Sequence, residues 1–395
     1  MAALPLLRLQ NGRDKRVRYG HPWVYSNEIV MTPELKALPA GSVVRVDAPS
    51  SEPLGVGLFN PRSLIAVRFL SRDPKAKIDQ AFLADRLAKA LALREALYKK
   101  PYYRLVHAEA DGLPGLVIDR YGDVLVCQMN SAGMDRLREP LIAALEETVG
   151  PKAIVLRNDT AAREQEGLEQ TVEVVKGKLP SPLKLEENGV KFFADLAEGQ
   201  KTGWFFDQRD NRAFMAALAK DRRVLDVYSY AGGFAVQAAV AGAIEVIACD
   251  RSEQALALAS KAAEANKVSN KFKSLKGEAF SELEKMAEAG ERFGVVICDP
   301  PAFVKSQKDL ATGSKGYRKI ARLGASLVEP GGFLFVASCS HNMELARFAE
   351  EVARGVGGAG RTGRVIRTAG AAPDHPVHPL LPESAYLKAQ VFQLD

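Results

Sequence analysis

The sequence predicts an α/β protein whose C-terminal part forms a doubly wound, Rossmann-like domain. After about residue 189, apolar strand-like runs alternate with helical patterns, as they do when crossover helices connect the parallel strands of one sheet. Several of these strands end in a carboxylate or lead into a Gly pair. Open α/β sheets bind their ligands at the carboxyl ends of the strands, so this edge is the place to look for a site.

The clearest strand is the run Val295-Val-Ile-Cys-Asp-Pro-Pro-Ala-Phe303. Its first residues are typical of a buried parallel strand. Pro300 and Pro301 end it because proline has no N–H and a fixed φ. Asp299 is therefore expected at the edge of the sheet, followed by a stiff surface against which a flat ligand could lie. For Asp-Pro-Pro alone, a simple turn capped by the Asp is an equally good interpretation.

The other elements of this domain follow from the same alternation. Strands are expected at 223–227, 245–250, 272–275 and 332–339, and helices at 234–241, 252–266, 280–289 and 315–328.

The first 72 residues predict a small β-barrel that binds RNA. Short β-like runs at 42–46, 54–59 and 64–70 are separated by Gly, Pro and Asn. Ten Lys and Arg residues stand against five Asp and Glu residues, which accounts for most of the net charge of +6. Such an excess favours a polyanionic partner, although a solvated basic face is the alternative. The candidate RNA-binding residues are Arg13, Lys15, Arg16 and Trp23, and for Trp23 core packing is the stronger interpretation.

Residues 73–180 predict a central α+β domain, which leaves 181–395 as the third domain. Helical periodicity covers 78–99, a hairpin with a Gly-Asp turn covers 111–129, a helix lies near 134–149, and a strand covers 153–157. A chain of 395 residues is long enough for two or three domains.

Composition narrows the class of protein. Hydrophobic residues make up 47% and charged residues 26% of the chain, which are globular values. No apolar run reaches about 18 residues, and residues 1–9 are too short for a signal peptide. A cytoplasmic protein without a membrane partner is therefore expected. The four cysteines lack metal-ligand or disulfide spacing, so no metal site is predicted.

The edge of the sheet suggests a nucleoside cofactor. The loop Asp226-Val-Tyr-Ser-Tyr-Ala-Gly-Gly-Phe234 leaves the first strand, and Gly232 and Gly233 let a ligand approach the backbone. It is not a GxGxxG motif, so pyrophosphate binding is poorly supported. Asp250 ends the next strand, where a carboxylate accepts ribose hydroxyls. S-adenosylmethionine fits this pattern better than NAD.

Cys339 indicates the chemistry. It ends the last predicted strand and should face the same edge as Asp299. A thiolate that adds to C6 of cytosine makes C5 nucleophilic enough to accept a methyl group. A buried strand cysteine is an equal alternative on position alone. Cys249 and Cys298 each precede the terminal Asp of a strand, point away from it, and are assigned to the core.

These residues resemble the bacterial 23S rRNA 5-methylcytosine methyltransferases of the RlmI type, which have a PUA, a central and a class I methyltransferase domain. The resemblance spans essentially the whole chain. It implies Cys339 as the nucleophile, Asp299 as the group that binds the cytosine edge, and Asp250 as the ribose ligand. It also implies an adenine contact from Glu278, where the family commonly has Asp. The motifs that carry it are Gly20-His-Pro-Trp23, Gln200-Lys-Thr-Gly-Trp-Phe-Phe-Asp-Gln-Arg209, Tyr230-Ala-Gly-Gly-Phe-Ala235, Asp299-Pro-Pro-Ala-Phe303, Lys315-Gly-Tyr317, Ser338-Cys-Ser340, Asp374-His-Pro-Val377 and Pro382-Glu-Ser-Ala-Tyr-Leu-Lys388.

The expected site thus has three groups of residues. The catalytic residues are Cys339 and Asp299. The expected cofactor-binding residues are Gln200, Thr202, Phe206, Asp207, Asp226, Tyr228, Gly232, Gly233, Phe234, Asp250, Arg251, Ser252, Glu278, Ala279 and Asp299. The expected substrate-binding residues are Pro300, Pro301, Phe303, Arg13, Lys15, Arg16 and Trp23.

Two other functions remain open from the sequence. Asp-Pro-Pro beside an aromatic residue also suits methylation of a base nitrogen, which needs no thiol. An RNA-binding ribosome-assembly factor with an inert methyltransferase fold would show no binding of S-adenosylmethionine. The partner is expected to be rRNA, with 23S rRNA favoured, and a homodimer is one oligomeric state compatible with the sequence.

Overall fold

The computed structural model describes residues 4–196, 199 and 202–395. The chain divides into two compact units. Unit 1 consists of Met1–Pro180, Gln200–Thr202 and Asp374–Pro382, and unit 2 consists of Ser181–Gly199, Gly203–Pro373 and Glu383–Asp395. Two short segments that lie within the C-terminal half of the sequence are therefore part of unit 1.

Unit 1 begins with a five-stranded sheet in the order β1-β3-β4-β5-β2. Apolar side chains from all five strands, including Val24, Val44 and Phe59, form a core of their own. The elements are β1 (Leu6–Arg8), α1 (Lys15–Arg18), β2 (Trp23–Tyr25), η1 (Ser26–Glu28), α2 (Pro33–Lys36), β3 (Ser42–Asp47), β4 (Pro53–Phe59) and β5 (Ile65–Ser71). The three β-like runs of the sequence correspond to β3, β4 and β5.

A second five-stranded sheet of unit 1 has the order β10-β9-β8-β7-β6 and packs against two long helices. Leu83 and Leu87 of α3 and Leu141 and Leu145 of α5 enter its core. The elements are α3 (Gln80–Leu97), β6 (Tyr102–His107), η2 (Ala108–Asp111), β7 (Leu116–Tyr121), β8 (Val124–Met129), α4 (Ala132–Arg136), α5 (Arg138–Thr148), β9 (Ala153–Asn158), α6 (Ala161–Gln165) and β10 (Thr171–Lys176).

Two details of this sheet differ from the sequence prediction. The single helix expected near 134–149 is two helices, because Leu137 leaves the helical conformation between α4 and α5. Strand β10 was not predicted. Its residues 171–174 are exposed, so they lack the alternating apolar pattern that identifies a half-buried strand.

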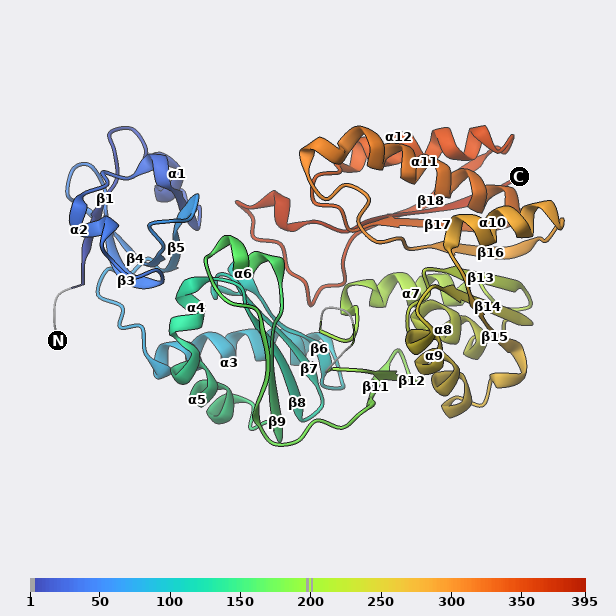
Figure 1. The fold of residues 1–395 in the computed structure, drawn as a ribbon, viewed down its shortest axis with the longest axis horizontal. Helices are drawn as coiled ribbons and strands as arrows, with labels where there is room; N and C mark the ends of the chain where they lie inside the picture. Colours follow the sequence, from blue (N-terminus) through green and yellow to red (C-terminus); the bar gives the residue numbers. More distant parts are fainter. Residues whose placement is uncertain (1–3, 197–198, 200–201) are drawn as a thin grey trace. The chain divides into compact units, whose positions relative to one another are not determined.

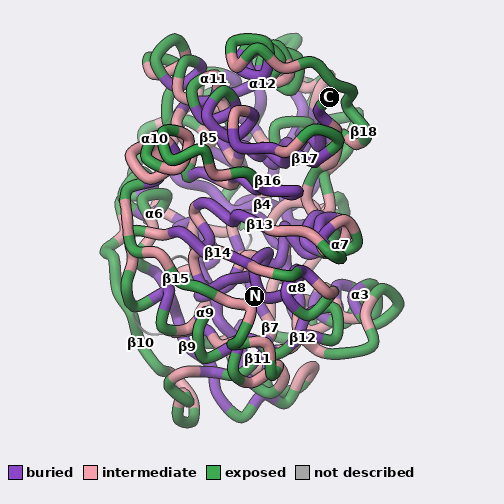
Figure 2. Tube along the Cα trace, turned by 90° about the vertical axis from the view of Figure 1, so that its right-hand side faces the viewer, coloured by how far each residue is buried: buried purple, intermediate pink, exposed green. Residues whose placement is uncertain are grey.

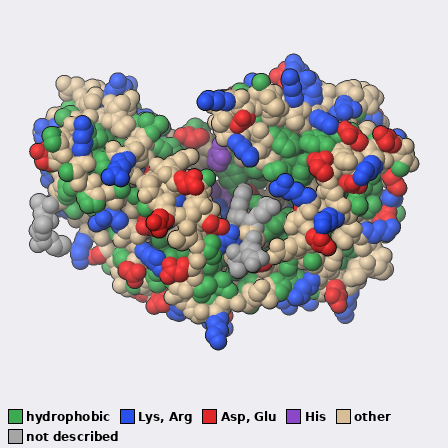
Figure 3. Space-filling view, viewed as in Figure 1, with side chains coloured by type: hydrophobic (Ala, Val, Ile, Leu, Met, Phe, Trp, Pro, Cys, Tyr) green, Lys and Arg blue, Asp and Glu red, His purple; other side chains and the backbone are tan. Residues whose placement is uncertain are grey.

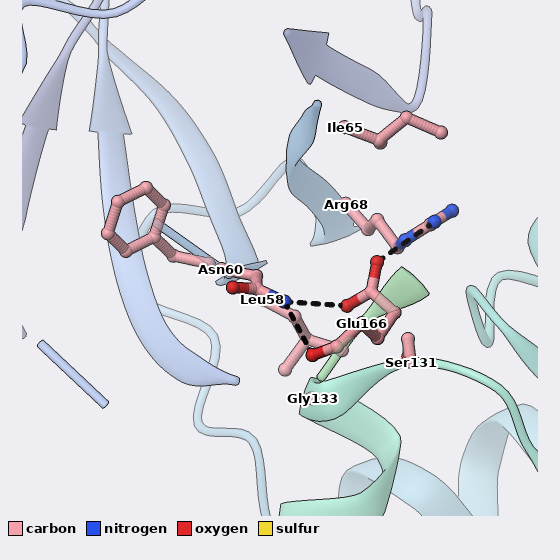
Figure 4. A pocket seen from close by; sticks show the side chains of 8 residues that line it. Leu58, Asn60, Ile65, Arg68, Ser131, Gly133 and Glu166 are labelled. Atoms are coloured by element: carbon pink, nitrogen blue, oxygen red, sulfur yellow. Dashed lines mark hydrogen bonds and ion pairs between the residues drawn. The ribbon is translucent and has the colours of Figure 1, made fainter. Parts of the chain in front are cut away.

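The two sheets of unit 1 are connected through the buried carboxylate of Glu166. It accepts a hydrogen bond from Asn60 Nδ2 at 2.9 Å, and Arg68 lies beside it (Figure 4). It also accepts one from Ser63 Oγ at 3.1 Å. The backbone N–H of Ala132 also donates to this carboxylate. Because a buried carboxylate needs several donors, these contacts fix the first sheet to the second.

Unit 2 contains a seven-stranded sheet in the order β15-β14-β13-β16-β17-β19-β18. The first five strands are parallel, while β19 is antiparallel to both of its neighbours. The strands are β13 (Arg223–Val227), β14 (Glu245–Asp250), β15 (Phe272–Lys276), β16 (Phe293–Cys298), β17 (Val328–Ser338), β18 (Gly363–Ala369) and β19 (Lys388–Leu394), and a separate hairpin is formed by β11 (Leu183–Glu187) and β12 (Val190–Ala194).

Helices cover both faces of this sheet (Figure 1). One face carries α7 (Arg209–Ala217), α8 (Gly233–Val240) and α9 (Glu253–Ala265), and the other carries α10 (Ala279–Glu288), α11 (Leu310–Leu327) and α12 (Leu345–Gly358). The short helices after β12 are η3 (Phe206–Gln208), η4 (Ser269–Lys271), η5 (Gln307–Asp309) and η6 (Pro382–Ser384). Figure 2 shows β13 and β16 in the colour of buried residues. The side chain of Val295 lies in the core between the sheet and α7–α9, and that of Val296 lies in the core between the sheet and α10–α12, because side chains alternate along a strand.

The predicted fold class is confirmed, and the order of the strands identifies the ligand-binding edge. Strand order reverses between β13 and β16, so the crevice outside their carboxyl ends is the topological switch point of the sheet. We call the residues that follow β13, β14, β16 and β17 the rim. No helix in the described part of the chain combines the length and the apolar composition needed to cross a bilayer.

Candidate active site

The loop from β13 to α8 holds a strained backbone at the rim. Tyr228 and Tyr230 have φ values of 64° and 48°, and Gly232, the N-cap of α8, has φ 76°. Left-handed residues that carry a Cβ are uncommon and cluster at functional sites. A Cβ on Gly232 would lie 2.8 Å from the Cβ of Ala259, so only glycine fits there.

Gly233 and Phe234 are the first two residues of α8, and both pack against other residues of unit 2 instead of facing the crevice at the rim. A Cβ on Gly233 would lie 2.5 Å from Arg212 Nε. The ring of Phe234 is buried in the core, 5.1 Å from the ring centre of Phe335. Of the expected cofactor contacts in this loop, Phe234 therefore offers its backbone and not its ring.

Asp250 ties this loop to the end of β14. Its Oδ2 accepts a hydrogen bond from Tyr230 N at 2.9 Å, and its Oδ1 accepts one from Ser252 N at 2.8 Å. Ser252 in turn caps α9 through Ala255 N, and Arg251 beside it is exposed. Each carboxylate oxygen can accept a second hydrogen bond, so Asp250 can still bind the hydroxyls of a ligand.

Asp226 is a buried acid at the switch point. Its Oδ2 accepts from Ala235 N at 3.0 Å, while its Oδ1 has no hydrogen-bond partner among the described residues. Burial raises the pKa of Asp226 to about 8, and the charges of Asp299 and Asp250 add to this rise. The negative charges of Asp250 and Asp299 at this edge favour a cationic ligand.

Asp299 is held by a residue that the sequence analysis did not assign. Gln208 Nε2 donates to Asp299 Oδ2 at 3.0 Å, and Asn211 Nδ2 donates to Gln208 Oε1 at 2.7 Å. Both amides are buried, with 2% exposed surface each. Because the Gln208 oxygen is occupied by Asn211, its NH₂ group faces Asp299. Gln208 lies within the Gln200–Arg209 motif of the family resemblance, and that motif is the feature of the sequence that could have identified Gln208 as a site residue.

Cys339 directly follows the last residue of β17 and is half-buried. The serines on both sides of it are anchored to α11, because Tyr317 Oη lies 2.8 Å from both Ser338 Oγ and Ser340 Oγ. β16 and β17 are adjacent parallel strands, with Cys298 paired to Val336. Asp299 and Cys339 therefore follow the ends of neighbouring strands, as predicted.

The other three cysteines behave differently from Cys339. Cys127, Cys249 and Cys298 are buried, and none of the four forms a disulfide. Burial raises the pKa of Cys249 to about 12 and raises that of Cys298 as well. The assignment of Cys249 and Cys298 to the core is confirmed.

The segment after Asp299 presents a mixed surface. Pro300 is buried and Pro301 is exposed. The half-buried ring of Phe303 lies 4.9 Å from the ring centre of Tyr317 and 6.1 Å from that of Phe280. Phe303 thus belongs to a row of aromatic rings, and its stacking on a target base stays a prediction.

Glu278 has a structural role besides the one expected for it. Its Oε2 accepts from Ser281 N at 2.9 Å and so caps α10, whose first residue is the buried Ala279. Glu278 is exposed and close enough to Tyr228 to contribute to the raised pKa of that phenol, of which burial is the main cause. An adenine contact would have to use the remaining acceptor capacity of this carboxylate.

The segment expected to close over the cofactor is divided between the units. Phe206 and Asp207 lie in η3 of unit 2, where Asp207 accepts a hydrogen bond from Tyr386 Oη at 2.5 Å. Thr202 belongs to unit 1, and its hydroxyl donates to Asp119. Gln200 lies outside the described residues.

The expected RNA-binding residues of unit 1 fall into two groups. Arg13 and Lys15 are exposed. Arg16 instead pairs with Glu28 at 2.8 Å, and Trp23 Nε1 donates to Glu109 at 2.7 Å. The side chains of Arg16 and Trp23 thus bind carboxylates within unit 1. Lys and Arg side chains are interspersed with Asp and Glu side chains on the face drawn in Figure 3.

Comparisons with known proteins agree with this geometry. A family model described as S-adenosylmethionine-dependent methyltransferase matches residues 162–392, and a PUA-like domain model matches residues 7–72. A candidate S-adenosylmethionine-dependent methyltransferase from Streptococcus mutans has the same fold, with a TM-score of 0.82 and 21% identity over 99% of this chain and 100% of the other. A candidate methyltransferase solved in complex with SAH has a TM-score of 0.84 at the same identity and coverage.

The fold and the family model define an S-adenosylmethionine-dependent methyltransferase. The rim fits this cofactor: Asp250 has acceptor capacity for hydroxyls, and the charges of Asp250 and Asp299 suit a sulfonium cation. Proteins named ribosomal RNA large subunit methyltransferase I are 38% identical over 88% of both chains in an Enterobacter strain, and 39% identical over 87% of this chain and 88% of the relative in Aliivibrio fischeri. The chain belongs to the ribosomal RNA large subunit methyltransferase I family.

Proposed function

We propose that this protein methylates C5 of a cytosine in the RNA of the large ribosomal subunit, with Cys339 as the covalent nucleophile. The observation that carries the proposal is the position of Cys339, half-buried at the end of β17, next to the strand that ends in Asp299-Pro300-Pro301. The names of the relatives supply the RNA class, and 23S rRNA is the bacterial form of that RNA.

Methylation at carbon needs a nucleophile because C5 of cytosine carries too little electron density. Addition of the Cys339 thiolate forms an Sγ–C6 bond and moves electron density to C5. S-adenosylmethionine supplies the methyl group that C5 accepts. A general base, to which no residue is assigned, then takes the C5 proton, the Sγ–C6 bond breaks, and the thiolate is restored.

Asp299 is the group of this chain best placed to orient the base. Gln208 donates to one of its oxygens, and a carboxylate oxygen can accept more than one hydrogen bond, so Asp299 has the acceptor capacity to bind the N3/N4 edge of cytosine. A base must leave its stack to reach a strand end in this way. Pro300, Pro301 and Phe303 would form the adjoining surface.

RNA affinity is assigned to unit 1, and chemistry to unit 2. Residues 1–72 match a PUA-like model and carry most of the excess positive charge, with Arg13 and Lys15 exposed. Residues 73–180 would then serve as the connecting domain and 181–395 as the catalytic domain.

Large-subunit rRNA fragments that contain 5-fluorocytosine test the mechanism. Fluorine at C5 cannot leave as a proton, so the wild-type enzyme should remain bound to the RNA after methyl transfer and survive a denaturing gel. Cys339→Ala should give neither adduct nor methylated product, yet still bind S-adenosylmethionine. Cys298→Ala is the matched control and should still form the adduct, because that thiol is buried in the core.

Two results would contradict the proposal. Full methyl transfer by Cys339→Ala would eliminate covalent catalysis and favour methylation of a base nitrogen. A wild-type protein that binds the fragments but transfers no methyl group to any of them would favour an inert RNA-binding factor.

A further inference from the structure

Lys388 is an unusual residue in the strand next to Cys339. It is the first residue of β19, pairs with Ser338 across the antiparallel ladder, and exposes only 7% of its surface. Its Nζ donates a hydrogen bond to the carbonyl oxygen of Ser340 at 2.6 Å. Lysine is rarely buried because its charge loses hydration, so a buried lysine calls for a physical explanation.

No carboxylate in the described part of the chain forms an ion pair with Lys388. Burial lowers the pKa of Lys388, and the charge of Cys339 opposes that lowering. By reciprocity, a cation that Cys339 stabilises also stabilises the ionised form of Cys339. Cys339 is thus the ionisable group whose charge favours the protonated form of Lys388.

Three other titratable groups of the described residues lie near Cys339: Tyr317, Asp299 and His341. Burial raises the pKa of Tyr317, which keeps its phenol neutral at pH 7. Asp299, which follows the neighbouring strand, would oppose a second negative charge. His341 is exposed, and its ring stacks on that of Tyr386 at 5.2 Å.

We infer that Lys388 is a positioning residue for Cys339: its ammonium group fixes the Ser340 carbonyl, and with it the turn that carries Cys339, and its charge favours the thiolate. The proton released from Sγ passes to solvent, which reaches the half-buried Cys339. The use of this thiolate in addition to C6 rests on the proposed function. The electrostatic effect of Lys388 on Cys339 is independent of the proposed function, because it is present without RNA or cofactor.

The test is the rate of alkylation of Cys339 by iodoacetamide between pH 5 and 10, measured on the full-length protein by peptide mass mapping. In the wild type, the midpoint should lie below about 8.5, the ordinary pKa of cysteine. Lys388→Gln keeps an N–H donor but loses the charge, and should raise the midpoint by about one pH unit. Lys388→Arg keeps the charge and should stay near the wild-type midpoint. Lys308→Gln, which removes the charge of an exposed lysine in η5, should change nothing.

The outcomes separate a charge effect from a packing effect. A lower unfolding temperature in Lys388→Gln with an unchanged midpoint would reduce Lys388 to a packing residue and overturn the inference. If Lys388→Gln does not fold, the alkylation midpoint of Cys339 in the wild type decides the question. A midpoint at or above about 8.5 would overturn the inference that Lys388 favours the thiolate. Methyl transfer by Cys339→Ala would refute the proposed function and leave this titration untouched.

Discussion

The buried carboxyl group of Asp226 makes a quantitative prediction about stability. Its side chain is fully buried, and burial raises its pKa from 3.8 to about 8. Between these two values the folded protein keeps a proton that the unfolded chain releases. The unfolding free energy of the wild type should therefore fall as pH rises from about 4 to about 8 and become level above the folded pKa.

The size of this effect follows from the shift. Each pH unit within the window contributes about 1.4 kcal/mol, so the contribution of Asp226 should change by about 2.7 kcal/mol between pH 5 and pH 7. Asp226→Asn has almost the same shape and no titration in this range. The difference in unfolding free energy between Asp226→Asn and the wild type should therefore grow in favour of the variant by that amount.

Urea unfolding without cofactor at pH 5, 6, 7 and 8 would measure this difference. The chain has two compact units, so the relevant transition should first be identified as the one that S-adenosylmethionine shifts to higher urea. The subtraction of the variant removes the contributions of all other titrating groups. Parallel stability curves for the two proteins from pH 5 to pH 8 would show that Asp226 is ionised in the folded state and refute the argument.

Two further predictions concern the ligands. Asp250→Ala removes the acceptor for Tyr230 N together with the expected ribose contact, and should weaken S-adenosylmethionine binding in calorimetry by roughly 1 to 3 kcal/mol; unchanged affinity would exclude Asp250 from the site. Replacing the exposed Arg13 and Lys15 together by Gln should weaken rRNA binding and reduce the slope of log K against log salt by up to about 2, without changing cofactor affinity. An identical salt slope would remove these two cations from the RNA interface.

The sequence alone predicted the five parallel strands of the unit 2 sheet and the edge at which they end. A short apolar run such as Val295–Cys298, ended by two prolines, is typical of a buried strand, and a carboxylate at its end lies where the strand stops. The same local logic assigned Cys249 and Cys298 to the core. It did not predict the antiparallel strands β18 and β19 or the helices α7 and α12. For β18 the reason is that its first four residues are exposed and show no apolar period.

Only the tertiary structure shows which distant residues control these groups. Gln208 contacts Asp299 from 91 residues away, and Lys388 contacts Ser340 from 48 residues away. No periodicity in a sequence records such a pair, because it depends on the order in which strands and helices are placed side by side. The raised pKa of Asp226 has the same origin: aspartate is polar in any sequence, and its protonation is set by the burial and by the neighbouring carboxylates that folding imposes.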